Sequence, residues 1–296
     1  MKIKKLMKND DSVVGIIVAV LLIGLILIVM SILQTVFLPN WMKNIEADHM
    51  DEVSQQFSQL KFAIDIQKVF GEEDLPVSAP ITIGYKAFPI LQSSRSYGSL
   101  NINRDACIFE ITNSPLTEGI RVGNIVFSSF NSYFIDQSYV YESGAIIVDQ
   151  EDGNIMKIRP DIKLEFNGSD LSFNLTLIDI STIGNKGSAS GYGTYPILVE
   201  NIDQDESLPL EKFNAAVPGN VQIIITSSFV ESWDLYIKSL LNELGLPYTS
   251  ISKDSNHLII NLDTLSGEDG VGDVYINLDV IEIGAQIAPG WVERPQ

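Results

Sequence analysis

Residues 13–38, VVGIIVAVLLIGLILIVMSILQTVFL, contain no charged side chain, and this stretch decides the architecture of the chain. An α-helix rises about 1.5 Å per residue, so roughly 20 apolar residues cross the ~30 Å hydrocarbon core of a bilayer. The run is long enough to span that core. It also lacks the polar face that a core helix of a soluble protein turns toward water. We therefore expect residues 13–38 to form a transmembrane helix.

The charges on either side of this run predict its orientation. Residues 1–12 carry four lysines, whereas residues 39–52 carry one lysine, Lys43, followed by four acids. Positively charged flanks stay cytoplasmic, so we expect the N-terminus inside the cell membrane and the bulk of the chain outside it. A secretory signal peptide has a shorter apolar region and a small-residue cleavage site. The run has neither property, so the anchor is expected to stay on the mature protein.

The composition excludes some classes of function. The 296 residues carry a net charge of −19, and a nucleic-acid-binding protein needs a basic face that this chain does not offer. Acidity of this size favours a well-solvated outer surface. Cys107 is the only cysteine, so no intrachain disulfide can form. Stability outside the cell must come from burial of a core, for which ~250 residues are ample.

A second helical pattern follows the membrane run over residues 39–66. Its apolar positions recur at helical spacing: Ile45, Val53, Phe57 and Leu60. Trp41 stands where an interfacial aromatic anchor belongs. His49 fills the position between Ile45 and Val53, and Glu46, Asp48 and His49 are assigned to a solvated helix face in preference to a metal site. The apolar stripe must lie against the chain's own globular part or against a neighbouring copy. We favour the copy, because a hydrophobic helix just outside a membrane anchor suits bundling.

Residues 71–296 predict a β-rich head. Short β-prone runs are separated by Gly, Asn, Asp and Ser, which is typical of an antiparallel sandwich or of two packed sheets. Asp152 and Gly153 favour a hairpin turn. One amphipathic helix interrupts the strands after Ser227 or Ser228, and Gly245 is placed to end it. The fold class is therefore α+β, with a cytoplasmic leader (1–12), a transmembrane helix (13–38), a stalk (39–66) and an extracytoplasmic head (71–296).

The N-terminal region resembles archaeal type IV pilin-like proteins. The resemblance is carried by the basic leader, by KNDDSVVGIIVAVLLIGLILIVM and by the amphipathic continuation WMKNIEADHMDEVSQQFSQLKFAIDIQ. With DQSYVYESGAIIVDQEDGNIM, the chain looks like an uncharacterised family of archaeal envelope proteins. The resemblance implies a membrane helix that doubles as an assembly scaffold, with other copies or other pilin-like subunits as partners. It also implies a prepilin-type peptidase, which would cut at Lys8–Asn9.

This chain departs from the pilin pattern in two respects. The pilin peptidase often cuts after a Gly or a basic residue, and here the leader offers Lys8 but no Gly. Pilins also commonly carry a Glu a few residues into the mature chain, and residues 13–38 contain none. If the leader is cut after Lys8, Asp10 or Asp11 would take the place of that Glu.

Motifs for catalysis or metal binding are missing from the sequence. There is no H-E-x-x-H and no cysteine pair, so we expect no metal, no cofactor and no enzyme activity. The segment GSASG has Ala189 where a nucleophile elbow needs Ser, and it predicts a flexible loop. The acidic stretches DQEDGN, NIDQDES and SGEDGVGD lack the ligand spacing of a calcium loop and predict solvated turns.

Four further residues are candidates for modification or association. NGS at Asn167 and NLT at Asn174 are glycosylation sequons in the region expected outside the cell. Asn174 falls within an alternating strand, so its side chain would have to point outward. Gly15 and Ala19 form a small-xxx-small pair of the kind that allows close helix contact in membranes.

These patterns predict a membrane-anchored extracytoplasmic structural protein, resembling a pilin subunit or a minor pilin-like envelope component. The alternative is a monomeric, membrane-tethered binding module whose head recognises a surface polymer or a partner protein. The stalk separates the two hypotheses: if it serves assembly, its apolar side chains should stay partly uncovered by the head.

Overall fold

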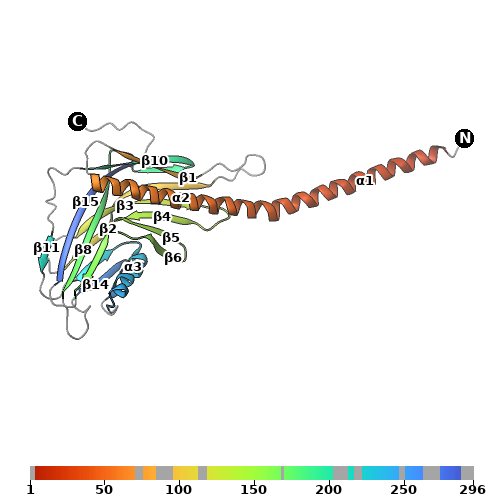
Figure 1. Ribbon diagram of the computed structural model, residues 1–296. Coiled ribbons are helices and arrows are strands. Elements are labelled where there is room, and N and C mark those ends of the chain that lie inside the picture. The colour runs from red at the N-terminus through yellow and green to blue at the C-terminus, as the bar shows by residue number, and fades with distance from the viewer. Residues whose placement is uncertain are drawn as a thin grey trace. The chain divides into compact units, whose positions relative to one another are not determined.

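The computed structural model (Figure 1) describes residues 4–70, 76–84, 96–112, 119–167, 170–202, 213–216, 222–246, 251–262 and 274–287. The chain divides into two units. The first unit comprises residues 1–48 together with 132–134, and the second comprises residues 49–131 together with 135–296. The boundary therefore falls inside the segment 39–66, which the sequence analysis treated as one stalk.

A single helical stretch begins the chain. It consists of α1 (Lys4–Ile32), a π-helical turn (Leu33–Phe37) and α2 (Leu38–Phe70). The π turn ends two residues before Pro39. A proline has no N–H to donate, and in a regular α-helix its ring clashes with the carbonyl four residues earlier. In the π turn the hydrogen-bond ladder widens by one residue, and the N–H of Leu38 donates to the carbonyl of Leu33. The helix thus continues past the proline.

The second unit contains two β-sheets. The six-stranded sheet has the order β1 (Val77–Gly84), β10 (Gly193–Asn201), β15 (Val274–Ile287), β8 (Leu171–Thr182) and β7 (Ile162–Phe166), with β11 (Phe213–Ala216) also paired to β15. The nine-stranded sheet has the order β13 (Ile251–Lys253), β14 (His257–Asn261), β12 (Gln222–Thr226), β2 (Tyr97–Ile111), β3 (Ile120–Phe130), β4 (Gln137–Glu142), β5 (Ala145–Gln150) and β6 (Gly153–Ile158), with β9 (Ser188–Gly191) also paired to β2.

The α+β class is confirmed: a long apolar helix is followed by a β-rich domain with one further helix. One pairing corrects the expected antiparallel arrangement. Strands β8 and β15 run parallel, in a register that extends from Leu171 opposite Val274 to Thr182 opposite Ala285. The sequence does not reveal this, because the side chains of a strand alternate between two faces whatever the direction of its neighbour.

Helix α3 (Val230–Glu243) closes the main core. The ring of Trp233 meets that of Phe109 edge-on, with centroids 5.5 Å apart. Gly245 ends the helix as predicted: its φ of +69° is in the left-handed region, and the next N–H, of Leu246, donates to the carbonyl of Leu241. The predicted hairpin turn at Asp152–Gly153 joins β5 to β6, and Gly153 has a φ of +140°.

The part of α2 beyond residue 48 belongs to the β-rich unit. Its inner face is fully buried: Val53, Phe57, Leu60 and Ile64. The ring of Phe57 lies 5.8 Å from that of Tyr139 on β4. On the outer face, Phe62 exposes 66% of its surface. This segment is therefore an integral helix of the domain.

Candidate membrane anchor and polar sites

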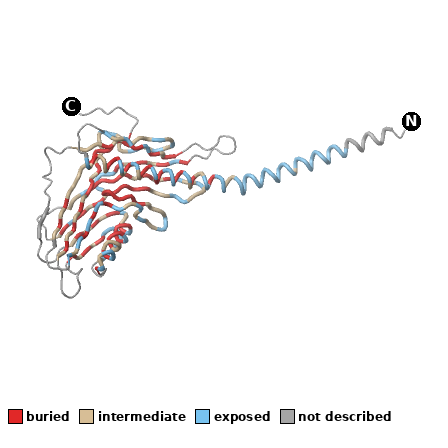
Figure 2. Tube along the Cα trace, in the orientation of Figure 1, coloured by how far each residue is buried: buried red, intermediate tan, exposed pale blue. Residues whose placement is uncertain are grey.

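The apolar part of the helical stretch, from Val13 to Phe37, is exposed. Every Val, Ile, Leu, Met and Phe side chain between Val13 and Phe37 exposes 45–68% of its surface. Figure 2 shows this stretch as an exposed segment. Its most apolar window has a mean hydropathy of 3.4 and is 0% buried. Exposing one such side chain to water costs roughly 1.5–3 kcal/mol. By length and composition, this is the one candidate membrane span among the described residues.

The residues predicted for helix association and leader cleavage lie on this helix. Gly15 has no atom within 4 Å of the position that a Cβ would occupy, and Ala19 is exposed. Self-association through this pair stays a prediction. Lys8 and Asn9 lie in the early turns of α1, and the structure describes only their backbone. Cleavage between them stays a prediction too.

The predicted stalk residues do not form an exposed face. Val53, Phe57 and Leu60 are each 0% exposed within the β-rich unit, and Ile45, in the first unit, is half-buried. The two hypotheses for the apolar stripe were a neighbouring copy and the chain's own globular part. At Val53, Phe57 and Leu60 the structure supports the chain's own globular part, because the β-rich unit covers these side chains.

Glu46 binds a distant loop, which corrects its assignment to a solvated face. Its side chain is 1% exposed. One carboxylate oxygen accepts the backbone N–H of Ser132 at 3.1 Å, and the other accepts those of Tyr133 at 2.7 Å and Phe134 at 2.6 Å. Charge-assisted hydrogen bonds of this kind are about twice as strong as neutral ones. No sequence signal showed that three N–H groups 86–88 residues away needed an acceptor.

His49 was assigned to the same solvated face and is also buried, at 5% exposure. Its Nε2 lies 2.8 Å from the carbonyl oxygen of Thr82 on β1, and its ring packs edge-on to Phe127. Asp48 is exposed, as expected. The imidazole is thus part of the packing between α2 and the strands.

A buried polar network surrounds Glu142, and the sequence analysis missed it. Glu142 ends β4 before a two-residue turn in which Ser143 and Gly144 both have positive φ, as tight hairpins require. One carboxylate oxygen accepts the Ser227 hydroxyl at 2.7 Å and the Trp233 indole N–H at 2.8 Å, and the other accepts the Asn124 amide at 3.3 Å. The one signal in the sequence is the dipeptide Ser143–Gly144, which is typical of the tight turn that follows Glu142.

Burial is the main influence on the two titratable side chains of this network, Glu142 and Cys107. Burial raises the pKa of Glu142, and hydrogen bonds from Trp233, Ser227, Asn124 and Cys107 oppose that shift. Burial also raises the pKa of the Cys107 thiol well above 9.0, and the nearby Glu142 raises it further. A nucleophilic cysteine needs the opposite shift and an accessible sulfur, whereas Cys107 is 0% exposed. The network is therefore a structural element of the core.

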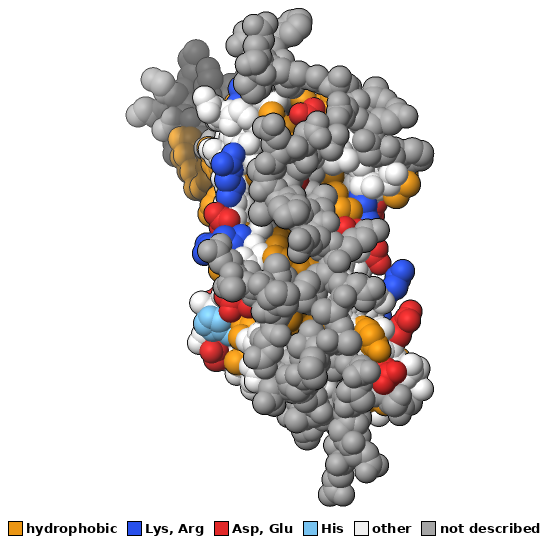
Figure 3. Space-filling model, turned by 90° about the vertical axis from the view of Figure 1, so that its left-hand side faces the viewer, with side chains coloured by type: hydrophobic (Ala, Val, Ile, Leu, Met, Phe, Trp, Pro, Cys, Tyr) orange, Lys and Arg blue, Asp and Glu red, His pale blue; other side chains and the backbone are white. Residues whose placement is uncertain are grey.

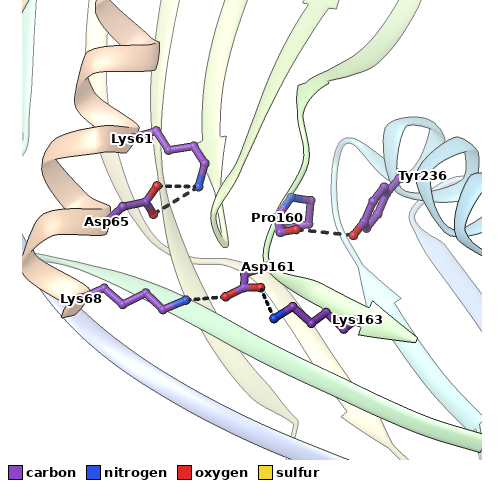
Figure 4. Close-up of polar contacts among 7 residues, drawn as sticks. All are labelled: Lys61, Asp65, Lys68, Pro160, Asp161, Lys163 and Tyr236. Carbon is purple, nitrogen blue, oxygen red and sulfur yellow. Dashed lines mark hydrogen bonds and ion pairs between the residues drawn. The ribbon is translucent and has the colours of Figure 1, made fainter. Parts of the chain in front are cut away.

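An ion pair joins α2 to the β-rich unit near the end of the helix (Figure 4). The Lys68 ammonium lies 2.8 Å from a carboxylate oxygen of Asp161, and Lys163 lies 3.9 Å from the other oxygen. The hydrogen bond from Lys68 is the main cause that lowers the pKa of Asp161. Next to Asp161, the carbonyl of Pro160 faces the hydroxyl of Tyr236 on α3 at 3.5 Å.

The acidic stretches form no metal site that the structure reveals. Residues 149–152 of the turn DQEDGN line a hollow together with Asp136, and burial raises the pKa of Asp149 there. Among the described residues, no three His, Cys, Asp or Glu side chains are placed to share a metal. Most of NIDQDES, from residue 203 on, and all of SGEDGVGD lie outside the described residues. On the face in Figure 3, described Lys and Arg side chains are interspersed with Asp and Glu.

The segment GSASG is partly ordered as a strand, not as the expected flexible loop. Residues Ser188–Gly191 form β9, which pairs with β2 through the register Gly98 opposite Gly191 to Asn101 opposite Ser188. Small side chains made the segment look unstructured, although backbone pairing needs no side-chain bulk.

The two sequons differ in their surroundings. Asn167 is exposed in the connection between β7 and β8, where its side-chain oxygen accepts the N–H of Asp170 at 2.8 Å. Asn174 lies within β8, half-buried, and its side-chain oxygen accepts the Asn277 amide of β15 at 2.6 Å. Asn167 is therefore the more accessible acceptor, and glycosylation at either position stays a prediction.

In comparisons with known proteins, no protein-family model matches the chain, and neither does a curated protein or a solved structure. The resemblance to pilin-like proteins therefore stays a prediction, and the functional argument rests on the geometry above.

Proposed function

We propose that the chain is a membrane-anchored structural protein that displays its β-rich domain outside the cell. The observation that supports this most directly is the contrast within one continuous helix. The stretch from Val13 to Phe37 is bare and apolar on all sides, whereas Val53, Phe57 and Leu60 are buried in the domain. A bilayer would supply the apolar surroundings that the described residues do not give to the first stretch.

The proposed orientation follows from charge. The four lysines among residues 1–12 would stay in the cytoplasm, and the acidic remainder of the chain would be exported. Protease added to intact cells should then remove the region beyond Trp41. If that region stays intact in cells whose outer envelope has been made permeable, the orientation is wrong.

The anchor could work alone or in a pilin-like assembly. Because Val53, Phe57 and Leu60 are covered by the chain's own domain, this stripe is not open to a second copy, and the proposed helix-mediated association uses residues 13–38. A pilin-like subunit would use the face that carries Gly15 and Ala19. A monomeric tethered module, the alternative, would leave every face of this helix to lipid.

Cysteine crosslinking in intact membranes separates these two forms. Ala19→Cys places a thiol on the small-residue face, and Leu21→Cys places one about 200° around the helix as a matched control. Cys107 is fully buried and serves as a silent background. A pilin-like assembly predicts crosslinks at position 19 that exceed those at position 21, and a monomer predicts none at either. Mass spectrometry of the mature N-terminus would test cleavage at Lys8–Asn9.

A further inference from the structure

We propose that Lys61, Lys68 and Lys163 form a binding site for phosphate or sulfate groups carried by an anionic polymer of the cell surface. All three lysines belong to the β-rich unit, and the site uses no residue of the unit that carries the anchor. Only the location of the polymer, outside the cell, rests on the proposed function. The site itself is argued from the contacts within the β-rich unit.

The ammonium groups gather around one carboxylate, that of Asp161. The Nζ of Lys68 lies 2.8 Å from one oxygen and the Nζ of Lys163 lies 3.9 Å from the other, on opposite sides of the carboxylate in Figure 4. A hydrogen bond from Lys68 is the main cause that lowers the pKa of Asp161, and the charges of Lys163 and Lys61 lower it further. Lys61 stands two turns before Lys68 on α2 and pairs with Asp65 at 3.1 Å. Three ammonium groups thus meet two carboxylates.

The backbone that carries Asp161 is held in place from two directions. The Tyr236 hydroxyl of α3 lies 3.5 Å from the carbonyl oxygen of Pro160 and 3.2 Å from that of Ile162. The N–H of Thr176 on β8 donates to the carbonyl of Asp161 at 3.3 Å. The segment opposite α2 is therefore fixed before any ligand arrives, and preorganisation of this kind lowers the entropic cost of binding.

The carboxylates of the cluster are more exposed than the ammonium groups they pair with. The side chain of Lys68 exposes 20% of its surface and that of Asp161 exposes 49%. The side chain of Lys61 exposes 17% and that of Asp65 exposes 40%. Lysine stems pack along the protein surface, whereas a carboxylate in an exposed pair adds little to stability. An incoming anion can therefore displace either carboxylate into solvent at low cost.

The donors of the cluster outnumber its acceptors, which favours an anion with several oxygens. Each ammonium has three N–H groups, whereas each carboxylate has two oxygens, and both oxygens of Asp161 already face an ammonium. A phosphate ester presents three acceptor oxygens. Lys61 and Lys68 are about 10 Å apart along the helix axis. A polymer with repeated charges covers that distance better than one small ion.

The surrounding charges make the proposed binding specific to this cluster. Arg159 pairs with Glu243 at 2.9 Å and is not counted in the site. Glu165 is exposed two residues beyond Lys163 on β7 and would oppose an anion at that edge. The whole chain carries a net charge of −19, so a polyanion has no general attraction to this protein. Any binding of a polyanion must come from a local excess of cations.

Isothermal titration calorimetry on the full chain in non-ionic detergent tests the proposal. The probes are dextran sulfate, uncharged dextran and inorganic phosphate, in low-salt buffer. We expect dextran sulfate to bind, dextran not to bind, and the affinity for dextran sulfate to fall as salt rises. Lys61→Gln combined with Lys68→Gln should weaken binding by about tenfold or more. Lys238→Gln, which loses a similar ion pair with Asp234 on α3, should bind like the parent.

Asp161→Asn should act in the opposite direction, because it removes the carboxylate that competes with the ligand. It should tighten the binding of dextran sulfate several-fold. Glu151→Gln, which removes the same charge from the exposed β5–β6 turn, should have little effect. Circular dichroism would check that each variant is folded.

Three results would overturn the inference: no binding of dextran sulfate or phosphate, a double lysine variant that binds like the parent, or equal effects of Asp161→Asn and Glu151→Gln. Phosphate binding that the double lysine variant loses, without any binding of dextran sulfate, would support the site and overturn the polymer as its ligand. None of these results bears on the anchor, which the protease experiment tests separately.

Discussion

Two parts of one helical stretch are both rich in apolar residues, but they differ in whether the apolar side chains are exposed or buried. Between Val13 and Phe37 the apolar side chains point in every direction, and no described part of the chain covers them. Between His49 and Ile64 the apolar side chains other than Phe62 form one stripe, and the β-rich unit covers it. The periodicity of the apolar positions, more than their number, thus tells which surface a helix is built to meet.

The largest effect is expected in the bare half. Leu25→Lys combined with Ile28→Lys places two charges near the centre of the run, each costing about 3 kcal/mol of insertion free energy. We expect the doubly substituted chain to leave the membrane pellet on alkaline extraction. Leu235→Lys, at an exposed position of α3, should remain fully pelleted. Equal retention of both variants would mean that the run does not hold the protein in the bilayer.

The buried half should respond through folding stability. Phe57→Ala empties a fully buried site and should lower the free energy of unfolding by about 3–5 kcal/mol. Phe62→Ala, on the exposed face of the same helix, should change it by less than about 0.5 kcal/mol. Thermal unfolding in detergent micelles, followed by near-ultraviolet circular dichroism, measures both. A Phe57→Ala chain that melts like the parent but fails to associate would restore the assembly hypothesis for the stalk.

The core network predicts a particular pH dependence. Burial raises the pKa of Glu142 above its ordinary value of 4.5, so the stability that its bound proton contributes is full below that value and is lost as pH rises through the folded pKa. The unfolding free energy of the parent minus that of Glu142→Gln should therefore fall with rising pH, by at most about 1.4 kcal/mol per pH unit. Glu151→Gln, on the exposed β5–β6 turn, serves as the control. A difference that grows with pH would refute this assignment.

The ion pair at the end of α2 should contribute least. Lys68 and Asp161 are 20% and 49% exposed, so Lys68→Ala should cost about 0.2–1 kcal/mol. Because the pKa of Asp161 is lowered, this contribution is present above the ordinary value of 3.8 and is lost as pH falls through the folded pKa. Chemical unfolding at pH 7 and pH 3 measures it. Lys163→Ala, at 3.9 Å and 70% exposure, should have a smaller effect, and the reverse order would contradict the geometry.

The sequence predicted the elements better than it predicted their partners. The apolar run, the end of α3 at Gly245 and the Asp152–Gly153 turn depend on neighbouring residues, and local patterns report them. The parallel pairing of β8 with β15, Glu46 with its loop and Glu142 with Trp233 join residues about 85–105 apart in the chain. Such contacts leave no local pattern, since a glutamate bound by buried N–H groups reads in sequence like a solvated one.

The same limit explains why the sequence did not identify what covers the apolar stripe of the stalk. A stripe such as Val53, Phe57 and Leu60 states that a helix face is covered, and it does not state by what. The choice between a neighbouring copy and the chain's own sheet needed the position of β4, whose Tyr139 packs on Phe57.

The most direct test is sedimentation velocity on residues 41–296 in detergent-free buffer. This chain lacks the bare half of the helix and keeps the buried half. Our account predicts a folded monomer over a wide concentration range, because the domain already covers Val53, Phe57 and Leu60. Concentration-dependent dimers or larger species that Phe57→Asp abolishes without unfolding the chain would contradict it, since they would show that the second half of the helix also meets a neighbouring copy.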